Sequence, residues 1–158
     1  MQIGIISDSH DNVQALHKAV SLFNEAGVSL VLHAGDLVSP FTAQPIQQLH
    51  MPFIGVFGNN DGDRVALNHA YSRRLNRSPY EVEFEGLDIL LMHEPDCLES
   101  IAKSRDYDAI VYGHTHSAEV REEETLIINP GECGGWVSGR RTVAVWDVTE
   151  KTVKILPV

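Results

Sequence analysis

Short apolar runs that end in polar turns recur along this sequence, and they restrict the folds open to it. The first run, residues 3–6, predicts a buried strand that stops at the polar stretch 7–12. Residues two apart on an extended chain point to the same side, so Asp8 and His10 can present a carboxylate and an imidazole together. A D-x-H pair is too short to define a site by itself, so its meaning depends on the rest of the chain.

Strands and helices are expected to alternate through the first half of the chain. Asp11 or Asn12 can cap a helix that ends at Gly27. The expected elements after the first strand are a helix over 13–25, a strand over 28–32, a helix over 41–49, a strand over 53–57 and a helix over 63–75. This alternation predicts a largely parallel sheet with helices on its faces.

The pattern changes in the second half, where strands outnumber helices. We expect a hairpin of strands 80–84 and 87–92 that turns at Glu85 and Gly86. A helix over 96–104 and strands over 109–112, 118–121, 126–128, 142–147 and 152–156 complete a second, more antiparallel half. The predicted fold class is α/β (α+β), with two packed sheets flanked by helices. A length of 158 residues suits one domain, over residues 1–158, with a full core.

Composition and charge exclude some classes of protein. No apolar run reaches membrane-spanning length and the N-terminus enters a strand directly, which favours a cytoplasmic protein without a membrane partner. Cys97 and Cys133 form no CxxC pair and are expected to be buried or partly buried free thiols. The net charge of -10 argues against stable nucleic-acid binding. Cations in a cleft would still let an acidic protein take an anionic substrate.

Side chains that can bind a metal ion follow the C-terminal ends of five predicted strands. They are Asp8, His10, Asp36, Asn59, His93, His114 and His116. In sheets of mainly parallel type, that edge is where sites form. Glycines that allow tight turns come directly before three of them, at Gly35, Gly58 and Gly113. The sequence therefore predicts that these side chains converge on one site.

The same residues, in this order, resemble the motifs of the calcineurin-like metallophosphoesterase superfamily. The motifs are D-x-H at Asp8, GD at Asp36, GN-x-D at Asn59, a single histidine at His93 and G-H-x-H at His114. The short chain and its GNND sequence resemble the small prokaryotic phosphodiesterases of that superfamily. The resemblance implies a four-layer αββα sandwich, in agreement with two mixed sheets flanked by helices.

The resemblance also implies a centre of two divalent metal ions bridged by Asp36. One ion would be held by Asp8, His10, Asp36 and His116, and the other by Asp36, Asn59, His93 and His114. A shared water or hydroxide would lie between ions about 3.5–4 Å apart, as in two-metal sites generally. Four imidazoles suit transition metals better than Mg²⁺, so we expect Mn, with Ni, Fe, Co and Zn as alternatives.

Charge counting then favours a small phosphodiester as substrate. Two divalent ions, two aspartates and one hydroxide leave a charge of about +1, which suits a monoanionic diester. Hydrolysis would proceed by in-line attack without a protein nucleophile. The predicted catalytic residues are Asn60, Asp36 and His114.

Two positions depart from the superfamily pattern. Many members carry a histidine where Asn60 stands, and an amide cannot act as a general acid toward the leaving oxygen. We therefore expect diesters with good leaving groups to be preferred. Glu132 stands where relatives often carry a small hydroxyl residue, and we interpret it as a solvated loop residue. His33 is interpreted as a structural histidine, and Asp61 as a residue that orients a turn.

Two alternatives to a phosphodiesterase use the same fold. A phosphomonoesterase or nucleotidase would share the predicted site. A protein-binding scaffold, as in a retromer subunit that this fold resembles, would be expected to lack metal ligands, whereas none of the seven is missing here. Small relatives are often dimers or larger, but this sequence carries no interface signature, so the oligomeric state stays open, with a homo-oligomer as one alternative.

Overall fold

The first strand, β1 (Gln2–Ile6), lies in the interior of the fold because both of its faces are apolar. In the computed structural model, which describes residues 1–158, Ile3 and Ile5 face a second sheet while Ile6 faces the helices. Strand β1 pairs in parallel with β2 (Leu30–His33) on one side and antiparallel with β10 (Thr142–Asp147) on the other.

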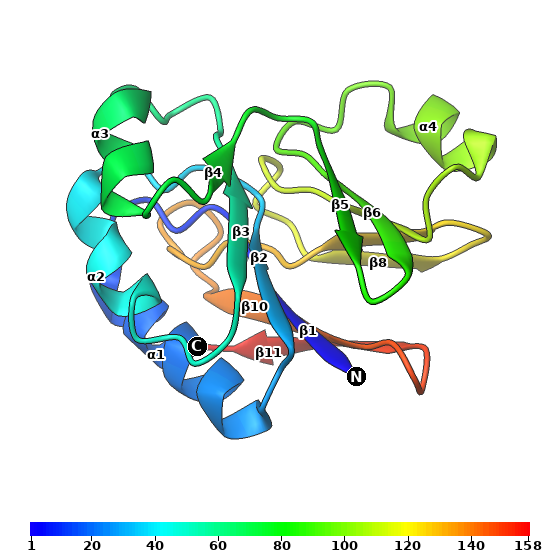
Figure 1. The fold of residues 1–158 in the computed structure, drawn as a ribbon, viewed down its shortest axis with the longest axis horizontal. Helices are drawn as coiled ribbons and strands as arrows, with labels where there is room; N and C mark the ends of the chain where they lie inside the picture. The colour runs from blue at the N-terminus through cyan, green and yellow to red at the C-terminus, as the bar shows by residue number, and fades with distance from the viewer.

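The strands form two mixed sheets (Figure 1). The six-stranded sheet has the order β11-β10-β1-β2-β3-β4, and the five-stranded sheet has the order β5-β6-β7-β9-β8. The remaining strands of the first sheet are β3 (Phe53–Val56), β4 (Leu75–Asn76) and β11 (Thr152–Pro157). Those of the second are β5 (Tyr80–Phe84), β6 (Leu87–Leu91), β7 (Ala109–Val111), β8 (Glu119–Glu122) and β9 (Leu126–Asn129).

Helices cover the outer face of each sheet and complete four layers. The helical segments are α1 (Val13–Ala26), the 3-10 turn η1 (Pro40–Thr42), α2 (Ala43–Ile46), α3 (Arg64–Ala70) and α4 (Leu98–Ser104). In Figure 1, α1, α2 and α3 lie beside the six-stranded sheet, and α4 lies beside the other sheet. The predicted αββα sandwich is confirmed. None of these helices combines the length and apolar character needed to cross a lipid bilayer.

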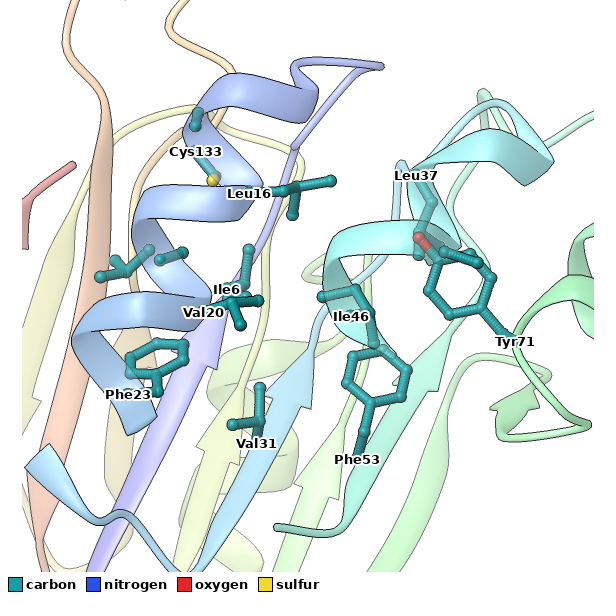
Figure 2. Close-up of a cluster of buried hydrophobic side chains, with 14 of the residues drawn as sticks. Ile6, Leu16, Val20, Phe23, Val31, Leu37, Ile46, Phe53, Tyr71 and Cys133 are labelled. Carbon is teal, nitrogen blue, oxygen red and sulfur yellow. The ribbon is translucent and has the colours of Figure 1, made fainter. Parts of the chain in front are cut away.

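Separate apolar clusters fill the three interfaces between layers. Figure 2 shows the first, where Leu16, Val20 and Phe23 of α1 pack over Ile6 and Val31. The second lies between the sheets, and the third lies between the five-stranded sheet and α4. Burial on both faces explains why the inner strands are continuous apolar runs.

The ends of α1 agree with the expected capping residues. The Asn12 side chain accepts the N–H of Ala15, and Gly27 ends the helix in the left-handed conformation at φ 64°. Asp11 has a different role, because its carboxylate accepts hydrogen bonds from the backbone N–H and hydroxyl of Ser39. Asn12 is therefore the cap, and Asp11 ties the loop after β1 to the loop after β2.

The prediction that strands β10 and β11 belong to the second half was wrong. Strand β10 returns to the first sheet and β11 forms its edge. Ala144 and Trp146 pack between the sheets, while Val143 and Val145 pack toward α1. A strand that is apolar on both faces fits the interior of either sheet, so its local pattern cannot select between them.

Two expected helices are shorter than predicted. Helix α3, predicted over 63–75, ends at Ala70, because Ser72 and Arg73 adopt the left-handed conformation. Leu75 then begins the short strand β4. The expected helix over 41–49 is reduced to η1 and α2.

The two cysteines differ in exposure. Cys133 is buried as predicted, but Cys97 is exposed, contrary to the expectation. Burial raises the pKa of Cys133 to about 12. We therefore expect a thiol reagent such as dithionitrobenzoate to modify one thiol per native chain rapidly and the second only after unfolding. Rapid release of two equivalents from the folded protein would contradict this, and a Cys97→Ser variant identifies the fast thiol.

Candidate metal centre

The parallel strands of both sheets deliver the predicted ligands to one place. Asp8 and His10 follow β1, Asp36 follows β2, and Asn59 follows β3. His93 follows β6, and His114 and His116 follow β7. Contacts between the two sheets join these loops, since the backbone N–H of His114 donates to the carboxylate of Asp8 at 3.0 Å. All seven predicted side chains lie in one connected cluster.

Asp8, His10 and His116 form the first part of the cluster. Nε2 of His10 lies 3.8 Å from Oδ1 of Asp8, and Nε2 of His116 lies 3.6 Å from the same oxygen. The two imidazole rings stack with their centroids 5.2 Å apart. The other oxygen of Asp8 accepts the hydroxyl of Ser7 at 2.6 Å as well as the N–H of His114. The carboxylate is therefore fixed with Oδ1 toward the two histidines.

Unsatisfied buried atoms show that a cation fits this first part. Oδ1 of Asp8 and Nε2 of His10 are both buried and have no hydrogen-bond partner. Buried polar atoms nearly always have partners, so these two require one. Asp8, His10 and His116 each offer one ligand atom within the reach of a single ion. Burial raises the pKa of Asp8 and so disfavours the ionised carboxylate. A nearby cation would oppose this effect and favour the ionised form.

Asp36 lies between the first part of the cluster and the second. Its Oδ2 is 3.4 Å from Nε2 of His10 and 3.4 Å from Nε2 of His93. Burial acts to raise the pKa of Asp36, but hydrogen bonds from His93 and Asn60 outweigh it and hold that pKa well below its usual range. Asp36 is thus an ionised carboxylate in contact with a histidine from each predicted ligand set.

Asn59, His93 and His114 form the second part. Oδ1 of Asn59 lies 2.8 Å from Nε2 of His93 and 3.0 Å from Nδ1 of His114. Nδ1 of His93 lies 2.7 Å from the carbonyl oxygen of Ala34, which can only accept a hydrogen bond. With Nδ1–H donating to that carbonyl, Nε2 can donate to Asp36 only when the ring is protonated; burial acts to lower the pKa of His93, but the hydrogen bond and charge of Asp36 outweigh it and raise that pKa. When the ring is neutral, Nε2 instead presents a lone pair toward the oxygens of Asn59 and Asp36. A proton or a cation must lie between these atoms, so this part also fits a metal ion.

The loops that carry the ligands have unusual backbone geometry. Five of the seven candidate ligands have positive φ, namely Asp8 (51°), His10 (40°), Asp36 (60°), His114 (67°) and His116 (58°). Each such residue costs on the order of 1–3 kcal/mol and persists only where its surroundings hold it. Here the loops hold each other, because the N–H groups of Asp8 and His10 donate to the carbonyls of Gly35 and Asp36. The site is therefore shaped by the chain itself.

Two buried polar residues beside the cluster have the structural roles expected from the sequence. His33 accepts the N–H of Gly35 on Nδ1, which leaves Nε2–H to donate to the hydroxyl of Ser9. Burial lowers the pKa of His33 to about 3, so the ring stays neutral. Asp61 accepts the backbone N–H groups of Asp36, Val38 and Gly58, which ties two ligand loops together.

Asn60 contacts Asp36 in this structure. Its side-chain amide donates to Oδ2 of Asp36 at 2.8 Å, and its backbone N–H donates to Oδ1 at 2.9 Å. Both oxygens of the central carboxylate are thereby oriented by one residue. The same amide lies at the edge of the cluster, since Asn60 is exposed while Asp36 is buried.

Two residues near the site were missed or misread in the sequence. Asn129 donates from its amide to the carbonyl of Gly113 and the hydroxyl of Thr115, which supports the loop of His114. Glu132 is not solvated as interpreted; it is 1% exposed, and its Oε1 lies 3.2 Å from Nδ1 of His116.

A signal for Glu132 was present in the sequence. Glu132 is the third residue after β9, as Asp36 is after β2 and Asn59 is after β3. Strand β9 runs parallel to β7. The placement rule that selected the other ligands therefore also applies to Glu132.

Comparisons with known proteins give matches across the whole chain. Residues 1–151 match the family model described as the calcineurin-like phosphoesterase superfamily domain. A phosphodiesterase from Methanocaldococcus jannaschii is 36% identical over 159 residues, which cover 96% of this chain and 95% of that protein. A solved archaeal phosphodiesterase covers 100% of both chains with 34% identity and a TM-score of 0.93. Vps29 from Entamoeba histolytica, complexed with Zn²⁺, covers 100% of this chain and 98% of its own with 19% identity and a TM-score of 0.71, a likeness of fold alone.

Proposed function

The chain belongs to the calcineurin-like phosphoesterase superfamily, and from this premise we propose that it is a phosphodiesterase dependent on two divalent metal ions. The observation that carries the proposal is the position of Asp36 between His10 and His93, at 3.4 Å from each ring. The unpartnered buried atoms of Asp8 and His10 support it, because they lie where one cation would bind. The match over residues 1–151 also supports a single metallophosphoesterase domain.

The proposed ligand sets follow the two parts of the cluster, with Asp36 shared. One cation is assigned to Asp8, His10, Asp36 and His116, and the other to Asp36, Asn59, His93 and His114. Asp8, His10 and His116 lie within reach of a single ion, and Asp36 and His93 lie within reach of one together with Asp8. When bound, such a pair of cations supplies Lewis acidity toward the phosphoryl oxygens and activates water as the nucleophile. With four imidazoles among the ligands, Mn, Ni, Fe, Co and Zn are better candidates than Mg²⁺, and Mn is the first to test.

The chain itself positions these groups before any cation binds. Ser7 and the N–H of His114 hold Asp8, while Asn60 and Asp61 orient the carboxylate and the backbone of Asp36. The carbonyl of Ala34 directs Nε2 of His93 inward. Such prior orientation lowers the reorganisation needed at the moment of reaction.

A diester is favoured over a monoester by charge. Hydrogen bonds from Ser138, Val137 and Trp136 overcome the effect of burial and lower the pKa of Glu132 to about 2, so it adds a third carboxylate beside Asp8 and Asp36. This extra negative charge weakens the attraction of the site for a dianionic monoester more than for a monoanionic diester. We therefore propose a small phosphodiester as the substrate.

The proposal is tested by hydrolysis of bis-nitrophenyl phosphate. Metal-stripped protein is expected to be inactive, and Mn²⁺ or Ni²⁺ is expected to restore activity. Nitrophenyl phosphate in parallel separates a diesterase from a monoesterase. Binding of two metal ions without activity on either ester would favour the protein-binding scaffold instead.

Because Asn60 stands where a general acid would be needed, we predict that the rate of diester hydrolysis depends strongly on the leaving group. Because an amide cannot donate a proton to the leaving oxygen, nitrophenyl esters are expected to react at least about 100-fold faster than matched alkyl esters, the size of a typical general-acid contribution. An Asn60→His variant should narrow that difference, with a pH dependence that wild type lacks. Equal rates for both esters in wild type would contradict the prediction.

A further inference from the structure

Glu132 is a buried carboxylate with a full set of donors from its own loop. Oε1 accepts the backbone N–H of Trp136 at 2.7 Å and of Val137 at 3.0 Å. Oε2 accepts the backbone N–H and the hydroxyl of Ser138 at 2.8 and 2.7 Å. A carboxylate held by four donors has a fixed orientation, so its direction toward neighbouring groups is set by the loop.

The fixed carboxylate faces one nitrogen of His116. Oε1 of Glu132 lies 3.2 Å from Nδ1 of His116, and Nε2 on the opposite side of the ring lies 3.6 Å from Oδ1 of Asp8. The two atoms are within ion-pair distance but lack the alignment of a hydrogen bond, and Nδ1 has no other partner, so it is the negative charge of Oε1 that favours a proton on Nδ1. The lone pair of the neutral ring then lies on Nε2, toward Asp8. The charge of Glu132 thus favours one of the two neutral forms of the His116 ring.

The loop of Glu132 is also attached to the loop after β1 that carries Asp8 and His10. The backbone N–H of Gly134 donates to the carbonyl of Asp8, and the indole N–H of Trp136 donates to the carbonyl of His10 at 2.9 Å. A methyl group on Gly134 would approach the carbonyls of Ser9 and Asp8 at 2.9 and 3.0 Å, so the two segments are in close contact. The loop of Glu132 is therefore held against the loop that carries two of the proposed ligands of the same cation.

We propose that Glu132 is a positioning residue that fixes His116 with its proton on Nδ1 and its Nε2 lone pair toward the cation site beside Asp8. The inference rests on the proposed function, because it assigns a role toward that metal centre. His93 in the second part of the cluster is oriented by a neutral carbonyl instead. A carboxylate partner raises the basicity of a histidine ligand more than a carbonyl does, so the two cation sites should respond differently to loss of Glu132.

The first test measures binding of Mn²⁺ to metal-free protein by calorimetry, with activity as a secondary readout. Glu132→Gln is expected to weaken one of two sites by about 10- to 100-fold and to leave the other unchanged. His116→Ala should weaken the same site at least as much. Glu150→Gln is the matched control, because it makes the same change at an exposed glutamate beyond the end of β10 that pairs with the start of β1, at the opposite end of β1 from Asp8. It should bind both ions as wild type does.

The second test locates the ring proton of His116 in the wild-type protein, so it does not depend on whether a Glu132 variant folds. In metal-free wild type at a pH where the ring is neutral, nitrogen-15 NMR should place the His116 ring proton on Nδ1. The His116→Ala spectrum identifies the signal. In Glu132→Gln the proton is expected to shift at least partly to Nε2.

The outcomes separate the inference from the proposed function. Wild type that binds no divalent ion would overturn the metal centre. Wild type that binds two ions, beside a Glu132→Gln variant of unchanged affinity, would overturn only the role of Glu132. Equal weakening in Glu132→Gln and Glu150→Gln would also overturn it, since the general loss of one negative charge would then explain the effect. A ring proton on Nε2 in wild type would overturn it directly.

Discussion

Asp36→Ala is expected to reduce metal-dependent hydrolysis of bis-nitrophenyl phosphate by at least about 1,000-fold in kcat/KM. Asp36 is the carboxylate that contacts a histidine in each part of the cluster, at 3.4 Å in both cases. Its removal weakens both proposed cation sites together, and bound metal contributes several kcal/mol of transition-state stabilisation. Because 1.36 kcal/mol corresponds to tenfold in rate, about 4 kcal/mol corresponds to the expected loss.

The same variant should separate loss of metal from loss of fold. Metal-free Asp36→Ala is expected to remain folded, whereas added Mn²⁺ should raise the melting temperature of wild type and not that of the variant. Asp106→Ala, at an exposed aspartate remote from the ligand loops, is the control and should behave as wild type. An Asp36→Ala protein that retains metal-dependent hydrolysis would exclude the proposed centre.

Local patterns in the sequence predicted most elements and the candidate ligands, because both depend on short-range features. The run at residues 3–6 is apolar on both faces, and the polar residues directly after it belong to the edge where parallel strands end. The turn of the hairpin at Glu85 and Gly86 was also predicted from the sequence, and in the structure both residues adopt the positive φ that such two-residue turns require.

Features that depend on contacts across the chain could not be predicted in the same way. The pairing of β10 with β1 joins residues more than a hundred positions apart, and β10 is buried on both faces, so its pattern fits either sheet. The left-handed backbone of Asp8 and His114 is unfavourable locally and is stabilised only by neighbouring loops. Glu132 was misread although it follows β9 at the same offset as Asp36 follows β2, because its loop sequence suggested solvent while the turn that follows supplies its donors.

Gly58→Ala is expected to damage the site through lack of space. A methyl group at Gly58 would lie 2.6 Å from the backbone nitrogen of Asp36 and 2.8 Å from its Cγ, and it would overlap Oδ1. Overpacking of this kind costs about 1–3 kcal/mol of folding stability. Relief of the overlap must move the Asp36 carboxylate or its loop, and a displacement near 1 Å in a catalytic site can reduce activity about 100-fold.

Gly62→Ala is the matched control for this prediction, four residues along the same loop. A methyl group there meets no atom within 4 Å, so its effect on stability should stay within about 0.5 kcal/mol. Urea unfolding and hydrolysis of bis-nitrophenyl phosphate measure both variants. If Gly58→Ala matched Gly62→Ala in both measurements, the carboxylate of Asp36 would not need the position that the structure gives it. The close approach of the two loops would then be irrelevant to catalysis. If Gly58→Ala lost activity by far more than its loss of stability explains, the orientation of Asp36 would be the property that Gly58 preserves.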